Sequence, residues 1–363
     1  MIKPRCIENL NNPSRNSVLD VYRGIAIFTV VLFHFNLTFP YGYLGVDLFF
    51  VISGILVGGL LTRKYLNNEN IHFFRFILQR GFKIWPSYFF FLLIGSIVAR
   101  LLYAQTAPDQ IIPLNDIWRY VFFYQNFTGE PFHWSFDHVW SLCVEEHFYI
   151  LLPITLIVVA SIFKNHRKLF LYLSISGYIL LGITAKAIAY FFTDGKDTYS
   201  ATYNRLDALA WGILLIVLIY EKRLPVKKWI KATMLGAGIL LFTLSLYFDM
   251  YSGSDIYHKV VFQSLIPISF FLIIGATYHL NWRKLWPIRI MGYYSYNWYL
   301  WHVLFVIVTT GFLGNTPIGL CVLVLGSLAV AAIFTTLVEE PMLRLREKVI
   351  RPTKGLNCKP LQF

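Results

Sequence analysis

Ten long apolar runs, separated by polar gaps, dominate this 363-residue chain. Hydrophobic residues make up 57% of the sequence and charged residues 14%, whereas soluble domains carry about a quarter charged residues. A backbone inside a bilayer must satisfy its own hydrogen bonds, which favours helices for such runs. The sequence therefore predicts an all-α, polytopic membrane helix bundle of about ten transmembrane helices, in a single integral domain over 1–363. The expected spans are 18–38, 44–61, 84–103, 147–163, 169–191, 205–220, 229–247, 259–280, 290–311 and 317–338. We expect the first run to be a retained span and not a cleavable signal.

The basic residues occupy alternate gaps between these runs. Of the 32 Lys and Arg residues, 25 lie in one set of gaps, with Lys231 at the start of the seventh run counted among them, two lie in the other set and the remaining five lie within other runs. Cytoplasmic loops carry such an excess, so both termini are predicted to be cytoplasmic, with a basic N-terminus (1–17) and a basic tail (342–363). Topology explains the net charge of +13, and a nucleic-acid partner is not expected. Membrane lipids are the expected surroundings. The four cysteines lack metal or redox spacing, so no metal site is expected either.

The first run contains two residues that are costly to expose to lipid, Arg23 and His34. Eleven residues of helix make three turns plus roughly 20°, so both side chains point the same way, about 16 Å apart along the axis. The pair predicts a polar path along the helix, with a cation at one point and an imidazole at another. Asp20 can pair with Arg23 at i, i+3, which would lower the cost of burying both. A helix-end anchor with a hydrogen-bonded interhelical histidine is the structural alternative.

Arg80 and Lys83 precede the third run in FILQRGFKIWPSYF and share a helix face. With Arg23 they could form a cationic pocket for phosphates at the cytoplasmic mouth of the bundle. Interfacial Lys and Arg are more often simple topology anchors whose charged ends reach the interface.

Several other polar residues lie at the predicted membrane boundaries or inside a run. Glu145 and Glu146 open the fourth run, where acidic residues also suit a helix N-terminus. Arg205 and Asp207 form a similar boundary pair. His302 lies mid-run, where a satisfied structural histidine is the more common explanation. Glu339 could neutralise a cation or end the last helix.

The gap 104–146 is the longest on the predicted outer side and is rich in aromatic and acidic residues. Its segment IWRYVFFYQNF is too short and polar to span, so we expect an interfacial or re-entrant segment. Aromatic rings beside carboxylates suit sugar binding, although an aromatic belt with a solvated acidic loop is the commoner arrangement. Cations inside, an imidazole across the membrane and carboxylates outside suit a reaction between a phosphate-bearing donor and a polar acceptor.

These motifs resemble those of the integral-membrane acyltransferase-3 family of bacterial polysaccharide and glycolipid O-acyltransferases, in the family's order and over nearly the whole chain. Arg23 and His34 match its first-span motif, and Lys83 stands where the family usually has a second Arg, losing the planar guanidinium fork. Seven segments carry the resemblance: LDVYRGIAIFTVVLFH, GVDLFFVISGIL with Asp47, Arg80–Pro86, WSLCVEEHFY, RLDALAWG, SYNWYLWH and Glu339–Pro341.

The resemblance implies a multi-pass protein of the bacterial cytoplasmic membrane that is an O-acyltransferase. It implies acyl-CoA, usually acetyl-CoA, as co-substrate without a tightly bound cofactor, and a sugar or lipid-linked glycan acceptor at the outer face. His34 and Glu145 are the expected catalytic residues, and Arg23, Arg80 and Lys83 the expected donor-binding residues. The expected supporting residues are Asp20, Asp47, Glu146, Arg205, Asp207, His302 and Glu339. The chain also resembles the stand-alone branch, without a C-terminal hydrolase-like domain.

A transporter or flippase of an anionic or sugar-bearing substrate is the alternative function, because charged stations inside a bundle also suit transport. The sequence shows no inverted repeat or paired broken helices of the kind common in transporters, which counts modestly against it. The role of His34, as general base or as acyl carrier, remains open at this level.

Overall fold

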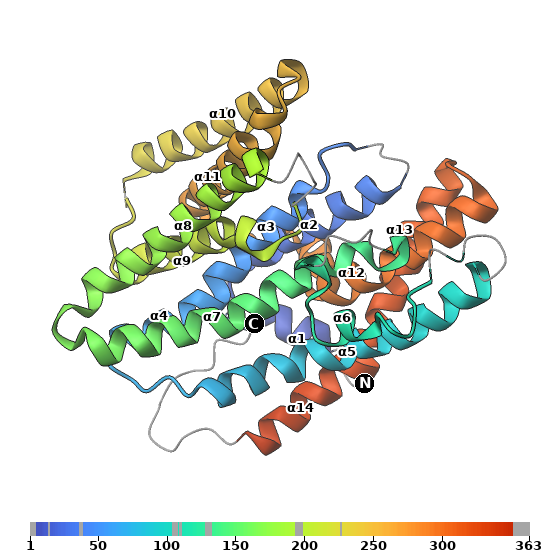
Figure 1. Cartoon of the computed structure of the whole chain (residues 1–363), viewed down its shortest axis with the longest axis horizontal. Helices are drawn as coiled ribbons and strands as arrows, with labels where there is room; N and C mark the ends of the chain where they lie inside the picture. Colours follow the sequence, from blue (N-terminus) through green and yellow to red (C-terminus); the bar gives the residue numbers. More distant parts are fainter. Residues whose placement is uncertain are drawn as a thin grey trace. The chain divides into compact units, whose positions relative to one another are not determined.

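The computed structural model describes residues 5–13, 15–35, 39–103, 108, 111–127, 133–192, 199–225 and 227–350. Within these ranges the regular structure is helical, and no strand occurs (Figure 1). The predicted all-α bundle is confirmed. The helices fall into two compact units that interleave along the chain.

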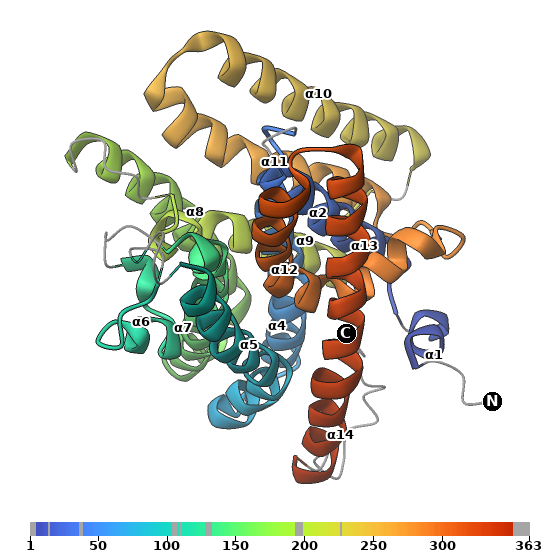
Figure 2. The same ribbon diagram turned by 90° about the vertical axis from the view of Figure 1, so that its right-hand side faces the viewer.

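The first unit comprises the residues up to Gly45, Phe74–Trp140 and those from Trp282 onward. Helix α12 is its centre, packing against α2, α13, α1 and η4. Its elements are α1 (Arg5–Asn11), α2 (Ser17–His34), α5 (Phe73–Tyr103), α6 (Ile117–Val121), η3 (Gln125–Phe127), η4 (Trp134–Val139), α12 (Trp286–Leu313), α13 (Pro317–Phe334), η8 (Thr335–Glu339) and α14 (Glu340–Val349). Figure 2 shows α13 and α14 running on as one orange-red column.

The second unit comprises Val46–Phe73 and Ser141–Asn281. Helix α9 is its centre and contacts α8, α11, α4 and η1. Its elements are α3 (Leu44–Ser53), η1 (Gly54–Gly58), α4 (Gly59–Leu66), α7 (Trp140–Ile162), η5 (Lys164–His166), α8 (Arg167–Phe192), η6 (Thr202–Asn204), α9 (Leu206–Tyr220), α10 (Lys228–Ser252), η7 (Tyr257–Phe262) and α11 (Gln263–Thr277).

Eight helical segments of the described chain are long and apolar enough to cross a membrane. They coincide with eight of the ten expected spans. The other two expected spans, 205–220 and 290–311, are also helical: α9 is apolar but only 15 residues long, and α12 has 28 residues with a more polar composition. The count of ten spans and the orientation of the termini therefore stay predictions. The expected start of the third span was too late, because α5 begins at Phe73 and includes Arg80 and Lys83.

Helices α2 and α12 run parallel and approach each other closely. A Cβ atom on Gly24 would collide with the carbonyl oxygen of Ile288, and one on Gly292 would collide with the carbonyl oxygen of Asp20. Small residues permit this backbone approach, as they do at many helix interfaces in membranes. The same two helices therefore stay in contact over the stretch that carries the polar residues of the first unit.

Three π-helical segments occur in the described ranges, η1, η7 and η8. Such segments are rare and often mark functional sites. Each adjoins a polar contact: Ser53 precedes η1, Ser264 follows η7, and Glu339 ends η8.

Candidate functional site

Helix α2 presents Arg23 and His34 as the sequence predicts, with both side chains partly exposed. The helix starts at Ser17 because the side chain of Asn16 accepts hydrogen bonds from the amides of Val18 and Leu19, at 2.9 and 3.3 Å. His34 is its last residue. The cap thus fixes where the helix begins, and eleven residues of helix then set the distance between the two functional side chains.

Both residues are held by partners from α12. The Nη2 atom of Arg23 donates to the hydroxyl of Ser295 at 3.0 Å. The Nδ1 atom of His34 lies 3.3 Å from Nε2 of His302. Ser295 and His302 are seven residues apart, which is close to two helical turns, so they lie on one face of α12. The parallel packing of α2 and α12 thereby holds both Arg23 and His34 in place.

A third imidazole, that of His138 from η4, completes a cluster of three histidines, of which His138 and His302 are buried. Its ring centroid lies 5.2 Å from that of His302, and the His34 and His302 rings are 4.9 Å apart. His138 was not among the residues expected from the sequence, although His133 and His138 stand in the aromatic gap before the fourth span. Among the described residues, no group of three or more His, Cys, Asp or Glu side chains could hold a metal ion.

The expected cations come together in the first unit. Lys83 of α5 lies within electrostatic range of Arg23 and Arg80. Its ammonium is also 3.8 Å from a carboxylate oxygen of Glu339. The backbone at this turn of α5 is attached to α12, because the hydroxyl of Tyr296 donates to the carbonyl of Ile84 at 2.6 Å. The cluster therefore contains the three cations expected from the sequence, with Arg15 also in range of Lys83 and the carboxylate of Glu339 beside it.

Glu339 is fixed in turn by Asn297, whose side-chain nitrogen donates both to Glu339 and to the hydroxyl of Thr335, each at 2.9 Å. Asn297 is fully buried. Asn297 was not expected, although an amide two residues after Ser295 inside an apolar run is itself a signal of a buried partner. Glu339 thus neutralises part of the cationic cluster and does not merely end a helix.

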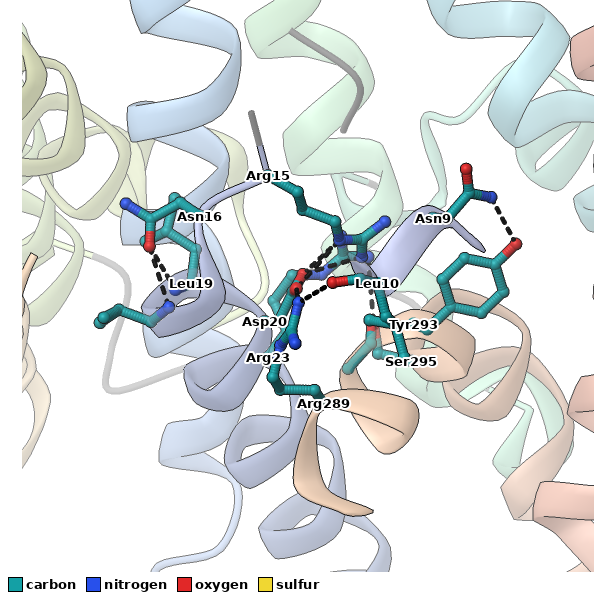
Figure 3. Close-up of polar contacts among 12 residues, drawn as sticks. Asn9, Leu10, Arg15, Asn16, Leu19, Asp20, Arg23, Arg289, Tyr293 and Ser295 are labelled. Atoms are coloured by element: carbon teal, nitrogen blue, oxygen red, sulfur yellow. Dashed lines mark hydrogen bonds and ion pairs between the residues drawn. The ribbon is translucent and has the colours of Figure 1, made fainter. Parts of the chain in front are cut away.

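Asp20 has partners other than the expected Arg23. Its carboxylate accepts from Nε of Arg15 at 2.8 and 2.9 Å and from Nη2 of Arg289 at 3.1 Å (Figure 3). Arg289 also donates to the carbonyl of Leu10 at 2.6 Å. These side chains are at most 7% exposed. Arg15, Asp20 and Arg289 together attach the N-terminal segment to α2 and α12. Arg23 instead donates to Ser295.

Glu145 lies in the second unit, on α7. It accepts from the hydroxyl of Ser53 at 2.5 Å and from the hydroxyl of Tyr149 at 2.8 Å. Glu146 beside it is buried. Glu145 lies inside α7, which begins at Trp140, so it does not cap the start of this helix. Its carboxylate contacts other side chains instead.

Arg205 and Asp207 have separate partners in the second unit. Arg205 pairs with Asp47 at 3.2 Å and lies over the ring of Tyr199. Asp207 pairs with Lys186 at 2.5 Å, and Lys186 also donates to the hydroxyl of Ser264 at 3.1 Å. Lys186 was not expected, although a lysine in the middle of an apolar span is itself a signal of a buried partner. The second unit thus contains two buried ion pairs.

The expected site residues divide between the units. The first unit contains Asp20, Arg23, His34, Arg80, Lys83, His302 and Glu339, and the second contains Asp47, Glu145, Glu146, Arg205 and Asp207. The first unit alone therefore holds both the cationic cluster and the imidazole cluster.

Comparison with known proteins relates this chain to acyltransferases. The family model described as an acyltransferase domain matches residues 16–336. O-acetyltransferase OatA of Staphylococcus aureus (strain MRSA252) is 25% identical over 98% of this chain and 61% of its own length. YrhL of Bacillus subtilis (strain 168) is 30% identical over 80% of this chain and 49% of its own length. Its name describes it, provisionally, as a peptidoglycan O-acetyltransferase.

This chain thus spans about 61% of the length of OatA. No solved structure matches it significantly. The family match covers most of both compact units and includes Arg23, Arg80, Lys83, His34 and His302. The chain belongs to the acyltransferase family defined by that domain, the acyltransferase-3 family whose motifs its sequence carries.

Proposed function

We propose that this protein is a membrane O-acetyltransferase that moves an acetyl group from acetyl-CoA at the cytoplasmic side to a sugar hydroxyl of a cell-envelope glycan at the outer face. The observation that carries the proposal is that α2 holds a cation and an imidazole on one face, and that α12 supports both. The names of the relatives agree with acetyl transfer. The bacterial cytoplasmic membrane is the proposed location.

The cationic cluster is the proposed site for the phosphates of the donor. Arg23, Arg80 and Lys83 supply the positive charge, and guanidinium groups bind phosphate oxygens through paired hydrogen bonds. Glu339 balances part of the charge of Lys83 until a phosphate replaces it as the counter-ion. Arg23 and His34 are about 16 Å apart along α2, a distance comparable to an extended pantetheine arm. The nucleotide can therefore remain at the cations while the thioester lies beside His34.

The proposed reaction is a general-base acyl transfer. The imidazole of His34 removes the proton from the acceptor hydroxyl, whose oxygen attacks the thioester carbonyl. A carbon–oxygen bond forms, the carbon–sulfur bond breaks, and the departing thiolate receives the proton from the imidazolium. Free CoA and the acetyl ester are the products. An imidazole is suited to this cycle because it takes up and returns a proton near neutral pH.

Thiol release by the purified full-length protein tests the function. With acetyl-CoA and peptidoglycan or lipid-linked glycan acceptors, we expect free CoA thiol and an acceptor 42 Da heavier, roughly the mass of one added acetyl group. His34→Ala should abolish both products, and His72→Ala, at an exposed histidine, should retain them. Near-normal product from His34→Ala would reject this assignment, and absence of thiol release with every acceptor would favour transport.

Donor binding is tested separately by titrating CoA into the protein. Arg80→Ala and Lys83→Ala should each raise Kd, and Arg63→Ala, at an exposed arginine, should not. Charge–phosphate contacts weaken with salt, so the wild-type Kd should also rise with ionic strength. An unchanged Kd in both cluster variants would reject the proposed pocket.

A further inference from the structure

We propose that His302 is a positioning residue that holds His34 in the tautomer whose Nε2 atom accepts the proton. This inference rests on the proposed function, because it concerns how His34 acts as the base. It assigns His302 a task beyond that of a structural contact between helices.

The hydrogen bond of His34 to its own helix identifies which nitrogen carries hydrogen. Nδ1 of His34 lies 2.9 Å from the carbonyl oxygen of Val30. A carbonyl oxygen only accepts hydrogen bonds, so Nδ1 must be the protonated nitrogen of the neutral ring. Nε2 then has the lone pair. Within the described residues, no hydrogen bond of His34 involves Nε2, which leaves it available for a substrate hydroxyl.

The same reasoning identifies the acceptor on His302. Its Nδ1 lies 2.7 Å from the carbonyl oxygen of Tyr299, so Nδ1 carries the hydrogen and Nε2 has the lone pair. That Nε2 lies 3.3 Å from Nδ1 of His34. The Nδ1–H group of His34 therefore faces two acceptors, the Val30 carbonyl and the His302 imidazole.

This arrangement disfavours the other tautomer of His34. If the hydrogen moved to Nε2, the lone pair on Nδ1 would face two other lone pairs, and the base would no longer be available. When Nε2 takes up a proton during the reaction, both acceptors remain opposite Nδ1–H and interact with the positive ring. An orienting group behind a catalytic histidine acts in this way in hydrolytic triads.

The surroundings of His302 fix its ring. The side chain is fully buried. The rings of Tyr299 and His138 contact it, with centroids 5.7 and 5.2 Å away. Tyr299 is tied to η4, because its hydroxyl donates to the carbonyl of His138 at 2.5 Å. An orienting residue needs such support, since a mobile ring would not select one tautomer.

Three substitutions at His302 separate orientation from packing. Glutamine can place a carbonyl oxygen near the position of Nε2, asparagine places one near Nδ1, and leucine has no acceptor. We expect His302→Leu and His302→Asn to lower kcat about 100-fold, the scale of a small misplacement of a catalytic group. His302→Gln should recover most of that loss. The KM for acetyl-CoA and the Kd for CoA should stay unchanged in all three, because the cationic cluster is intact.

Equal activity of the leucine and wild-type proteins, or a glutamine variant no better than leucine, would overturn the inference. If His34→Ala is active, the proposed function fails. If His34→Ala is inactive but His302→Leu is active, only this inference fails.

A spectroscopic measurement on the wild-type protein covers the case in which the variants do not fold. ¹⁵N-histidine labelling in lipid bilayers distinguishes a protonated from an unprotonated Nδ1, and the His34 signal is the one that His34→Ala removes. We expect Nδ1 of neutral His34 to carry the hydrogen. A neutral His34 protonated at Nε2 would contradict the proposal.

Discussion

The carboxylate of Asp207 lies 2.5 Å from the ammonium of Lys186, although Arg205 stands only two positions before it in the chain. Residues two apart on a helix do not face each other, whereas α8 brings Lys186 directly to α9. Both side chains are 1% exposed. Such a pair is costly to break from one side because the remaining charge stays buried.

We therefore expect Asp207→Asn to lower the free energy of unfolding by about 3–5 kcal/mol. Lys186→Met with Asp207→Leu should recover most of that loss, since neither charge then remains. Denaturant titration of the purified protein measures both effects. Asp255→Asn is the control, because its pair with Lys259 is exposed and should contribute less than about 1 kcal/mol. A double variant as unstable as Asp207→Asn would show that the charges are not paired with each other.

Asp20→Asn should be similarly costly, because Asp20 compensates both Arg15 and Arg289. We expect a loss of about 3–5 kcal/mol in the free energy of unfolding. Asp116→Asn, whose pair with Arg119 is partly exposed, should change it by less than about 1 kcal/mol. Adding Arg289→Met to Asp20→Asn should recover part of the lost stability, because Arg15 still lacks its partner, whereas adding Arg23→Met should not. Rescue by Arg23→Met alone would point back to the i, i+3 pair expected from the sequence.

The glycine contacts between α2 and α12 predict a packing effect. Gly24→Ala and Gly292→Ala should each lower the free energy of unfolding by about 1–3 kcal/mol, because the added methyl group meets backbone of the other helix. Acetyl transfer should fall as well, since the separated helices no longer align His34 with His302. Gly236→Ala on α10 meets no neighbouring atom and should raise helix stability by up to about 1 kcal/mol. Unchanged stability of Gly292→Ala would contradict the close approach.

The orientation of the helices can be tested with single cysteines in a cysteine-free background. The basic gap at 221–231 is predicted to be cytoplasmic and the short gap before α13 to be outside. A membrane-impermeant maleimide should label Thr316→Cys in intact cells and Lys222→Cys only after permeabilisation; both positions are exposed. Labelling of Lys222→Cys in intact cells would reverse the proposed topology, and with it the side from which the donor enters.

The sequence predicted where the helices lie better than it predicted which side chains pair between them. Apolar runs are local, so all ten coincide with helices, and the spacing of Arg23 and His34 follows from helix geometry alone. Contacts between distant segments are not local. Arg289 follows Asp20 by 269 residues and Asn297 precedes Glu339 by 42, and nothing in the sequence links them.

Lys186 shows a different limit. It is recognisable in the sequence as an unusual charged residue within a span, whereas most of the expected polar residues lie at the predicted boundaries. Its partner Asp207 was singled out, but with its neighbour Arg205. A charge inside a membrane span needs a partner from another helix more often than from its own, so span interiors are informative when boundaries are ambiguous.

The π-helical segment Thr335–Glu339 has a consequence for how this protein can vary in length. It brings both of its end residues to the amide of Asn297. A π-helical turn holds about one residue more than a regular turn, so removal of one residue would convert the segment to α-helix and shift Thr335 and Glu339 relative to the amide of Asn297. Chimeras that join this helix to that of another acyltransferase should therefore preserve the number of residues across the junction as carefully as their identity.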